Sequence, residues 1–202
     1  EGDHMGSIAD TGAQVAPAAA GRSFNPTSKA FRWLMAAIII VASAVGYYGA
    51  SLHYGVSDAE TAQKIWAITL HKQIATTTLF LIVARLAWRA FHRPPPLADM
   101  PPIMKHLTHL GHASLYVLMV AVPVSGWANS SSAGYGIPVA GLFFIPGLVA
   151  KNPALTPYLV WTHWLLSWAM ILTVAGHVAF ALKHHFLDKD ATLTAMMPRS
   201  ER

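Results

Sequence analysis

Four long apolar segments constrain this chain more than any other feature of its sequence. Each is close to the roughly 20 residues that an α-helix needs to cross the hydrocarbon core of a bilayer. Because backbone polar groups find no water there, a single segment crosses as a helix whose hydrogen bonds are internal. The sequence therefore predicts an all-α integral membrane protein, a four-transmembrane-helix bundle with spans at residues 30–48, 65–88, 107–128 and 159–182.

The composition supports a membrane protein. Hydrophobic residues make up 54% of the 202 residues and charged residues only 11%, whereas soluble domains carry about 25% charged residues. The formal net charge of +5 would also suit nucleic acid, but basic residues that collect on one side of a bilayer explain it better. We therefore expect the lipid bilayer as a partner and no nucleic acid. The absence of cysteine excludes disulfides, thiolate metal sites and covalently attached c-type haem.

The placement of lysine and arginine predicts the topology. Basic residues gather before the first span, between the second and third spans, and after the fourth. Because such residues favour the cytoplasmic side, both termini and the middle loop are expected in the cytoplasm. We divide the chain into a vector remnant with a flexible N-terminal tail, a four-helix membrane domain and a cytoplasmic C-terminal tail, at residues 1–28, 29–187 and 188–202.

Two connections stand out between the spans. Residues 92–102 are rich in proline and are expected to form a stiff, non-helical cytoplasmic connection. Residues 140–150 are apolar but too short to span, and Pro146 interrupts them. We expect this second segment to form a loop at the membrane interface.

The fourth span carries two histidines in its interior, His163 and His177. An ionisable side chain inside a span is costly and therefore suggests a functional site. Their spacing covers about 1400° of helix, about 40° short of four full turns, so both lie on one face. About 21 Å of helix axis separates them. This separation fits two planar cofactors stacked at two depths of one bundle.

Facing ligands are available at both depths. His71 lies in the outer third of the second span, level with His163, whereas His109 and His112 lie in the first turns of the third span, level with His177. A haem iron takes two axial imidazoles, and helix bundles build such sites from facing helices. Depth matching supports a pair between His71 and His163. It also indicates a second site around His177, in which the facing ligand is His109 or His112.

Two different roles for these histidines fit the pattern less well. A single histidine in a span often does no more than hydrogen bond to a neighbouring helix, but this does not explain two sets matched in depth. A histidine-lined carrier of zinc or copper is a further possibility. Carriers of this kind usually add acidic residues, and the four predicted spans contain no Asp or Glu.

The sequence also resembles the bacterial cytochrome b561 family, which comprises four-helix di-haem membrane proteins. That family includes the superoxide oxidases and is related to the cytochrome b subunits of hydrogenases and formate dehydrogenases. The resemblance implies a multi-pass protein of the bacterial inner (cytoplasmic) membrane that binds haem b. It covers residues 24–198 and rests on "ITLHKQIATTTLFLIVARLAWR" (68–89), "THLGHASLYVLMVAVPVSGW" (108–127), "SSAGYGIPVAGLF" (131–143) and "HWLLSWAMILTVAGHVAFALKHHFLDKDATLTAMMP" (163–198).

The resemblance also implies ligands, and the chain departs from the family at one of them. The outer haem b of the family corresponds to His71 and His163, in agreement with the depth argument. The inner haem of the family uses the residue that matches His177 and a histidine on the first span, where this chain has Arg32. Arginine stays protonated and is no ordinary axial ligand, although it can pair with a haem propionate. A second haem would then take His112 or His109, or be lost.

The resemblance implies two functions. One is a superoxide:quinone oxidoreductase that passes electrons from periplasmic superoxide through haem b to ubiquinone. The other is an electron-relay or anchor subunit for a periplasmic redox protein. Groups suited to a quinone gather near the cytoplasmic side, namely His109, His112, Lys183, His184 and His185. A cationic outer surface that attracts superoxide is expected from Lys64, Lys72, Lys151 and His53.

Overall fold

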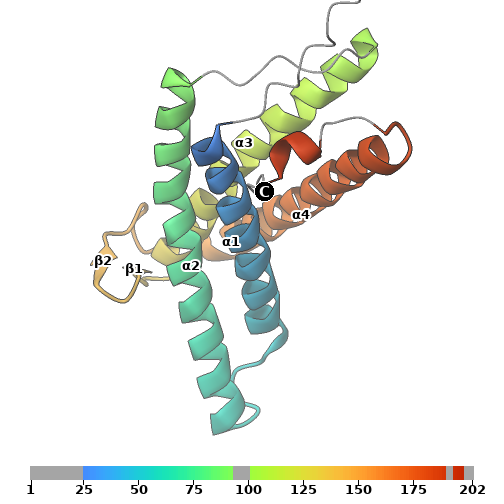
Figure 1. Ribbon diagram of the computed structural model, residues 1–202. Coiled ribbons are helices and arrows are strands. Elements are labelled where there is room, and N and C mark those ends of the chain that lie inside the picture. Colours follow the sequence, from blue (N-terminus) through green and yellow to red (C-terminus); the bar gives the residue numbers. More distant parts are fainter. Residues whose placement is uncertain (1–24, 93–100, 190–192, 198–202) are drawn as a thin grey trace, which may run out of the picture.

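A computed structural model describes residues 25–92, 101–189 and 193–197 (Figure 1). Four long helices dominate it, and each is long and apolar enough to cross a membrane. The prediction of four such helices is confirmed, and every helix extends beyond its predicted span at both ends. The helices are α1 (Pro26–Ser51), α2 (Asp58–Phe91), α3 (Pro102–Ser132) and α4 (Thr156–Phe186).

Polar residues explain where two of these helices begin. The side chain of Asn25 accepts a hydrogen bond from the Thr27 N–H at the start of α1. At the start of α2, the Ser57 hydroxyl oxygen accepts one from the Glu60 N–H at 3.0 Å. Such side chains satisfy N–H groups that lack a partner within the helix. The helices therefore start in polar residues, several positions before the apolar segments that predicted the spans.

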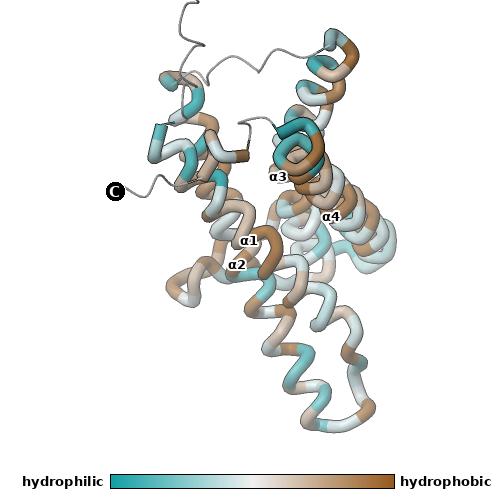
Figure 2. Tube along the Cα trace, turned by 45° about the vertical axis from the view of Figure 1, so that its right-hand side comes forward, coloured by the Kyte–Doolittle hydropathy of each residue, from teal (hydrophilic) through white to brown (hydrophobic). Residues whose placement is uncertain are grey.

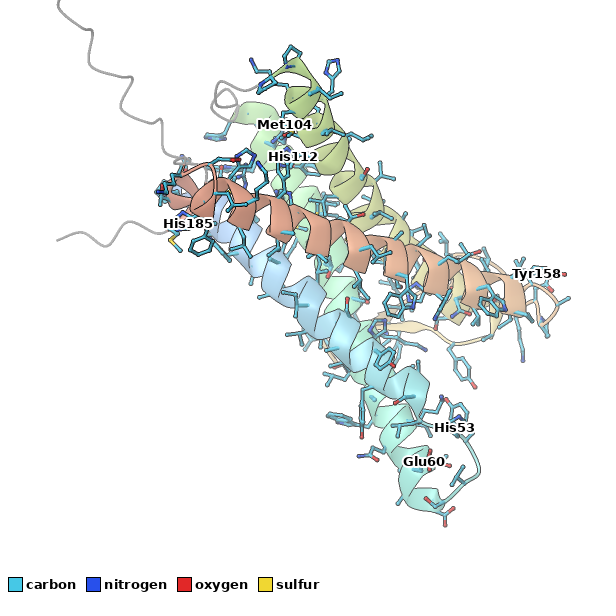
Figure 3. The ribbon with its side chains drawn as sticks, turned by 90° about the vertical axis from the view of Figure 1, so that its right-hand side faces the viewer. His53, Glu60, Met104, His112, Tyr158 and His185 are labelled. Carbon is cyan, nitrogen blue, oxygen red and sulfur yellow. The ribbon has the colours of Figure 1, made fainter. Side chains whose placement is uncertain are left out.

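The helices form two antiparallel pairs. α1 packs along α2 and α3 along α4, and the two pairs cross (Figure 1). One buried residue from each helix meets in a central cluster, Met35, Ile82, Met119 and Met170. We call the end at which α1 and α3 begin the terminal end, and the end at which α1 joins α2 and α3 joins α4 the connection end. Figure 3 shows His53 and Glu60 at one extreme, far from His112 and His185.

Many large apolar side chains point away from this core. Phe80 is 55% exposed, Val117 65% and Leu172 66%, although all three lie in the middle of helices. Figure 2 shows brown and pale colours along much of α3 and α4. A soluble protein rarely exposes so much contiguous apolar surface. These faces are suited to contact with lipid.

The connection between α3 and α4 contains a structure that was not predicted from the sequence. Strands β1 (Ile137–Val139) and β2 (Phe143–Ile145) pair antiparallel in register, with Val139 opposite Phe143. Gly141, with a φ of 73°, lies in the turn between them in a conformation that glycine adopts without strain. β1 is buried and packs against α2. The expected loop over residues 140–150 is therefore in part a small β-hairpin.

The end of the chain returns to the start of α1. A 3₁₀-helix, η1 (Thr194–Met196), precedes Met197, whose carbonyl accepts a 2.8 Å hydrogen bond from the Lys29 ammonium. The Trp33 indole N–H donates to the Met196 carbonyl at 3.1 Å. The described N- and C-terminal parts therefore lie together at the terminal end. The expected connection over residues 92–102 falls mostly outside the described residues.

Candidate functional site

His71 of α2 and His163 of α4 face each other where the two helix pairs cross. Their ring centroids are 6.1 Å apart, and the rings are inclined by 66°. Two imidazoles that share one metal ion, each through a bond of about 2 Å, hold their ring centroids about 6 Å apart. The spacing therefore suits a single metal ion with one axial ligand from each helix pair.

Each of these rings is oriented by a carbonyl of the helix to which its own helix is paired. The Nδ1 atom of His71 lies 2.9 Å from the Ala42 carbonyl oxygen on α1. The Nδ1 atom of His163 lies 3.1 Å from the Val122 carbonyl oxygen on α3. Because a carbonyl only accepts, Nδ1 of each ring carries the proton and donates. The Nε2 atom of each ring is then the basic nitrogen, as a metal-binding histidine requires.

Two glycines make room for this arrangement. Gly46 lies four residues after Ala42 on α1, and a Cβ atom there would lie 2.7 Å from Nδ1 of His71. Gly126 lies four residues after Val122 on α3, and a Cβ atom there would lie 3.0 Å from Cε1 of His163. The residue at i+4 covers the carbonyl of residue i in a helix. Each glycine therefore lets the imidazole approach a carbonyl that any other residue would shield.

Haem b fits this pair of residues better than a bare metal ion does. A protein site for zinc usually supplies three or four ligands, but a haem macrocycle leaves only two axial positions to the protein. Among the described residues, the histidines come in pairs, and no group of three or more His, Asp or Glu side chains converges. The buried pair, its two oriented rings and the two glycines match the smaller requirement.

A second pair of histidines lies nearer the terminal end. The rings of His112 on α3 and His177 on α4 have centroids 5.3 Å apart and are inclined by 60°. Of the two candidates for the partner of His177, the structure brings His112 to it. This spacing is shorter than the first, and within the described chain no hydrogen bond to a carbonyl orients either ring. The rings of the second pair are therefore less well oriented for metal binding than those of the first pair.

Arg32 lies within electrostatic range of both rings of the second pair. Its guanidinium also donates to the Met196 sulfur at 3.0 Å, which ties it to the C-terminal segment. A positive charge at this place suits a carboxylate close by.

The residues predicted to bind quinone are only partly brought together. Lys183 and His184 share Asp188, with Nζ of Lys183 2.7 Å and Nδ1 of His184 3.0 Å from one carboxylate oxygen. His109 is exposed, and its Nδ1 atom lies 2.7 Å from the Lys105 carbonyl of its own helix. His185 packs against the neighbouring Phe186 ring. Asp188, the group that joins Lys183 to His184, was not predicted from the sequence.

Two of the four residues expected in a cationic surface at the connection end make contacts with neighbouring segments. Lys64 lies in α2, and its ammonium donates to the carbonyls of Gly49 and Leu52 at the end of α1. It therefore caps that helix. The backbone N–H of His53 donates to the Glu60 carboxylate at 2.8 Å, so an acid accompanies this histidine. The other two residues are Lys72 and Lys151.

Lys72 and Lys151 approach the same short loop. The Lys72 ammonium lies 5.2 Å from the centroid of the Tyr135 ring, and the stem of Lys151 packs against Gly134. Lys72 also follows His71 directly in the sequence. Lys72 therefore lies close to the first histidine pair. Lys72 and Lys151 both contact the loop that contains Gly134 and Tyr135.

The contacts that orient His71 and His163 were not predicted from the sequence. Backbone carbonyls carry no residue-specific signal, so nothing in the sequence indicated Ala42 or Val122. Ser125 was also missed, although its hydroxyl lies 3.0 Å from Nδ1 of His163. The available signal was a glycine on the helix that pairs with a histidine-bearing one, namely Gly46 on α1 and Gly126 on α3.

Comparison with known proteins shows the family of this chain. The prokaryotic cytochrome b561 family matches residues 23–199. Cytochrome b561 homolog 2 of Escherichia coli (strain K12) is 34% identical over 178 residues, which cover 88% of this chain and 92% of that protein. The probable superoxide oxidase CybB of Yersinia pestis is 28% identical over 169 residues, 83% of this chain and 91% of that protein.

The four helices, each long and apolar enough to cross a membrane, and the family match together indicate a multi-pass haem b membrane protein of the electron-transfer class. The chain belongs to the prokaryotic cytochrome b561 family, whose members are haem b membrane electron-transfer proteins. The resemblance recognised in the sequence is thereby confirmed.

Proposed function

We propose that this protein is a superoxide:quinone oxidoreductase of the bacterial inner membrane, with both termini in the cytoplasm. The observation that carries the proposal is the His71–His163 pair, whose rings are held 6.1 Å apart near the connection end. With this topology the connection end faces the periplasm. The name of the Yersinia pestis relative supports superoxide as the substrate.

Haem b held by His71 and His163 would supply one-electron transfer at an iron that has no open position. In the overall reaction two superoxide anions each lose one electron and become O₂. Ubiquinone gains these two electrons and two protons and becomes ubiquinol. The protein must therefore attract an anion at one end of the bundle and deliver protons at the other.

Lys72 and Lys151 suit the first task. Positive charge near a site raises the rate at which an anion meets it, and salt screens that attraction. We expect stopped-flow mixing with superoxide to reduce the haem, at a rate that falls as salt is added. Lys72→Gln together with Lys151→Gln should slow this reaction by about tenfold at low salt and remove most of its salt dependence. Lys105→Gln, a neutralisation at the terminal end, serves as the control and should change neither.

Two results would count against this assignment. A rate that is indifferent to salt and to both lysines would remove the proposed attraction. Failure of superoxide to reduce the haem of a fully loaded protein would favour the alternative function, an electron-relay or anchor subunit for a periplasmic redox protein.

The second task falls to the terminal end. Lys183, His184 and Asp188 form a connected group there, and histidine can pass protons near neutral pH. We propose that this group, together with His109 and His185, serves a quinone. In the superoxide experiment with ubiquinone present, His184→Gln should slow reoxidation of the haem and leave its reduction by superoxide unchanged. Equal reoxidation in the variant and the wild type would place the quinone elsewhere.

We further propose a second haem b between His112 and His177, with Arg32 beside one of its propionates. Its support is the approach of the two rings and the arginine that replaces the ligand of the family. A haem-to-protein ratio near two is expected for the wild type. His112→Ala and His177→Ala should each lower it to about one. A ratio near one in the wild type, unchanged in both variants, would mean that these histidines serve only the quinone.

A further inference from the structure

Three arginines converge at the terminal end around a single tyrosine. Arg32 comes from α1, Arg85 and Arg89 come from α2, and Tyr116 comes from α3. The guanidinium carbons of Arg85 and Arg89 lie 5.3 Å and 5.4 Å from the centroid of the Tyr116 ring. Three like charges repel one another at such close quarters. A cluster of this kind is therefore suited to an anion.

The protein itself supplies weak acceptors to this cluster. Arg85 donates to the Met35 sulfur at 3.6 Å, and a thioether is a poor acceptor. Within the described chain neither Arg85 nor Arg89 pairs with a carboxylate. The acids described there are Asp58 and Glu60 at the start of α2, and Asp188, which pairs with Lys183. The planar guanidinium groups thus keep donors for an oxyanion.

A narrow cavity opens among these arginines. It is lined by all three arginines, Tyr116, and the Ser28 and Trp88 side chains, which hydrogen bond to each other at 3.1 Å. Its volume is only about 30 Å³, so it cannot admit a quinone ring or a porphyrin. It can admit one small charged group whose parent molecule lies outside. Neither His112 nor His177 lines it, which sets it apart from the second histidine pair.

The position of the cavity indicates what that molecule is. Arg89 is exposed and lies two residues before the end of α2, and Trp88 beside it is a residue type typical of the membrane interface. At this level a bilayer carries its phosphate groups. Basic pockets between helices at this depth are suited to lipid headgroups, and arginine binds phosphate through two parallel hydrogen bonds.

We propose that the cavity between α1, α2 and α3 binds the phosphate group of an anionic phospholipid, held chiefly by Arg85 and Arg89 and closed by Tyr116. The acyl chains then lie along the exposed apolar faces of the helices. A bound lipid neutralises part of the arginine charge and joins α1 and α2 to α3 at the terminal end. This site shares Arg32 with the second proposed haem, and its other residues have no part in the proposed superoxide and quinone chemistry.

The test uses the full-length protein, loaded with haem and reconstituted in phosphatidylcholine bilayers with or without phosphatidylglycerol. After exchange into detergent, native mass spectrometry measures the phosphatidylglycerol that stays bound. The wild type and the Lys105→Gln control should retain it. Arg85→Gln with Arg89→Gln should retain at least about tenfold less. Arg85→Lys with Arg89→Lys, which keeps both charges but loses the guanidinium forks, should retain an intermediate amount.

Haem content, measured on the same samples, separates this site from the haem sites. We expect the haem-to-protein ratio of both double variants to equal that of the wild type. Equal lipid retention in the wild type and the glutamine double variant would overturn the proposal. So would a loss of haem with unchanged lipid retention, because the arginines would then hold a haem propionate. If the glutamine double variant fails to fold, lipid retention and the haem-to-protein ratio of the lysine double variant test the proposal instead.

Discussion

Replacing His71 or His163 with alanine is expected to abolish the low-spin spectrum of the haem between them. In the proposed site each ring would supply one ligand, and within the described residues no third His, Asp or Glu side chain joins the pair. The His71 and His163 rings are 6.1 Å apart, and each is fixed through Nδ1 to a carbonyl of another helix. Loss of either would leave at most one ligand, so we expect the haem-to-protein ratio to fall by about one or the spectrum of this haem to become high-spin.

The control for this experiment is His53→Ala. His53 is exposed and lies in the connection between α1 and α2 (Figure 3), far from the histidine pairs. This variant should keep the spectrum of the wild type. A normal low-spin spectrum in His71→Ala or in His163→Ala would show that the two rings do not share an iron.

Filling either glycine position beside the pair should have nearly the same effect. Valine at position 46 or 126 would place a branched side chain against the ring of His71 or His163, because even a Cβ atom would lie 2.7 Å or 3.0 Å from it. The ring would be pushed from its carbonyl and from the axial position. We expect the haem-to-protein ratio after purification to fall by about one in Gly46→Val and Gly126→Val.

Two other glycines provide matched controls. A Cβ atom at Gly111 or Gly176 would meet nothing within 4 Å, so Gly111→Val and Gly176→Val test the cost of valine in a helix without a clash. Both should bind haem as the wild type does. Equal haem content in all four variants would mean that close approach of the helix backbone to the ring is unimportant.

The sequence predicted the elements that depend on repeated patterns. Spans of about 20 apolar residues predict membrane helices, and all four helices extend beyond the predicted spans, in α1 and α2 from the polar caps Asn25 and Ser57. Histidine depth, counted along each span, predicted that His71 would lie level with His163, and the structure brings their rings together. Both inferences use a period or a length that is fixed by helix geometry.

Features that depend on contacts between distant segments were not predicted. Lys64 looked like a solvated charge, but it reaches back to the last carbonyls of α1, a contact set by how α1 and α2 pack. The segment over residues 140–150 was expected to be a loop because it is too short to span the membrane. It forms part of a β-hairpin because the chain turns at Gly141 and β1 is buried against α2. No sequence pattern predicts that Arg85 and Arg89 both lie against Tyr116. In the sequence, Arg85 is simply a residue of the second span, and Arg89 is one of the basic residues that follow it.

Arg32 shows how a departure from the family can be located but not interpreted from sequence alone. Its place on the first span predicted the loss of a ligand. The structure adds its neighbours, the His112–His177 pair on one side and the arginine cluster around Tyr116 on another. These contacts led us to propose His112 as the replacement ligand and to separate that site from the phosphate site.

The measurement that tests the central claim most directly is low-temperature electron paramagnetic resonance of the oxidised, purified wild-type protein. We predict a low-spin ferric signal of bis-imidazole type, with the strong anisotropy of ligand planes that are far from parallel, since the His71 and His163 rings are inclined by 66°. The part of that signal that comes from this haem should be lost in His71→Ala and in His163→Ala, so that only the signal of the second proposed haem remains. A high-spin ferric signal in the wild type, or a low-spin signal of wild-type intensity in both variants, would contradict a haem shared by these two rings.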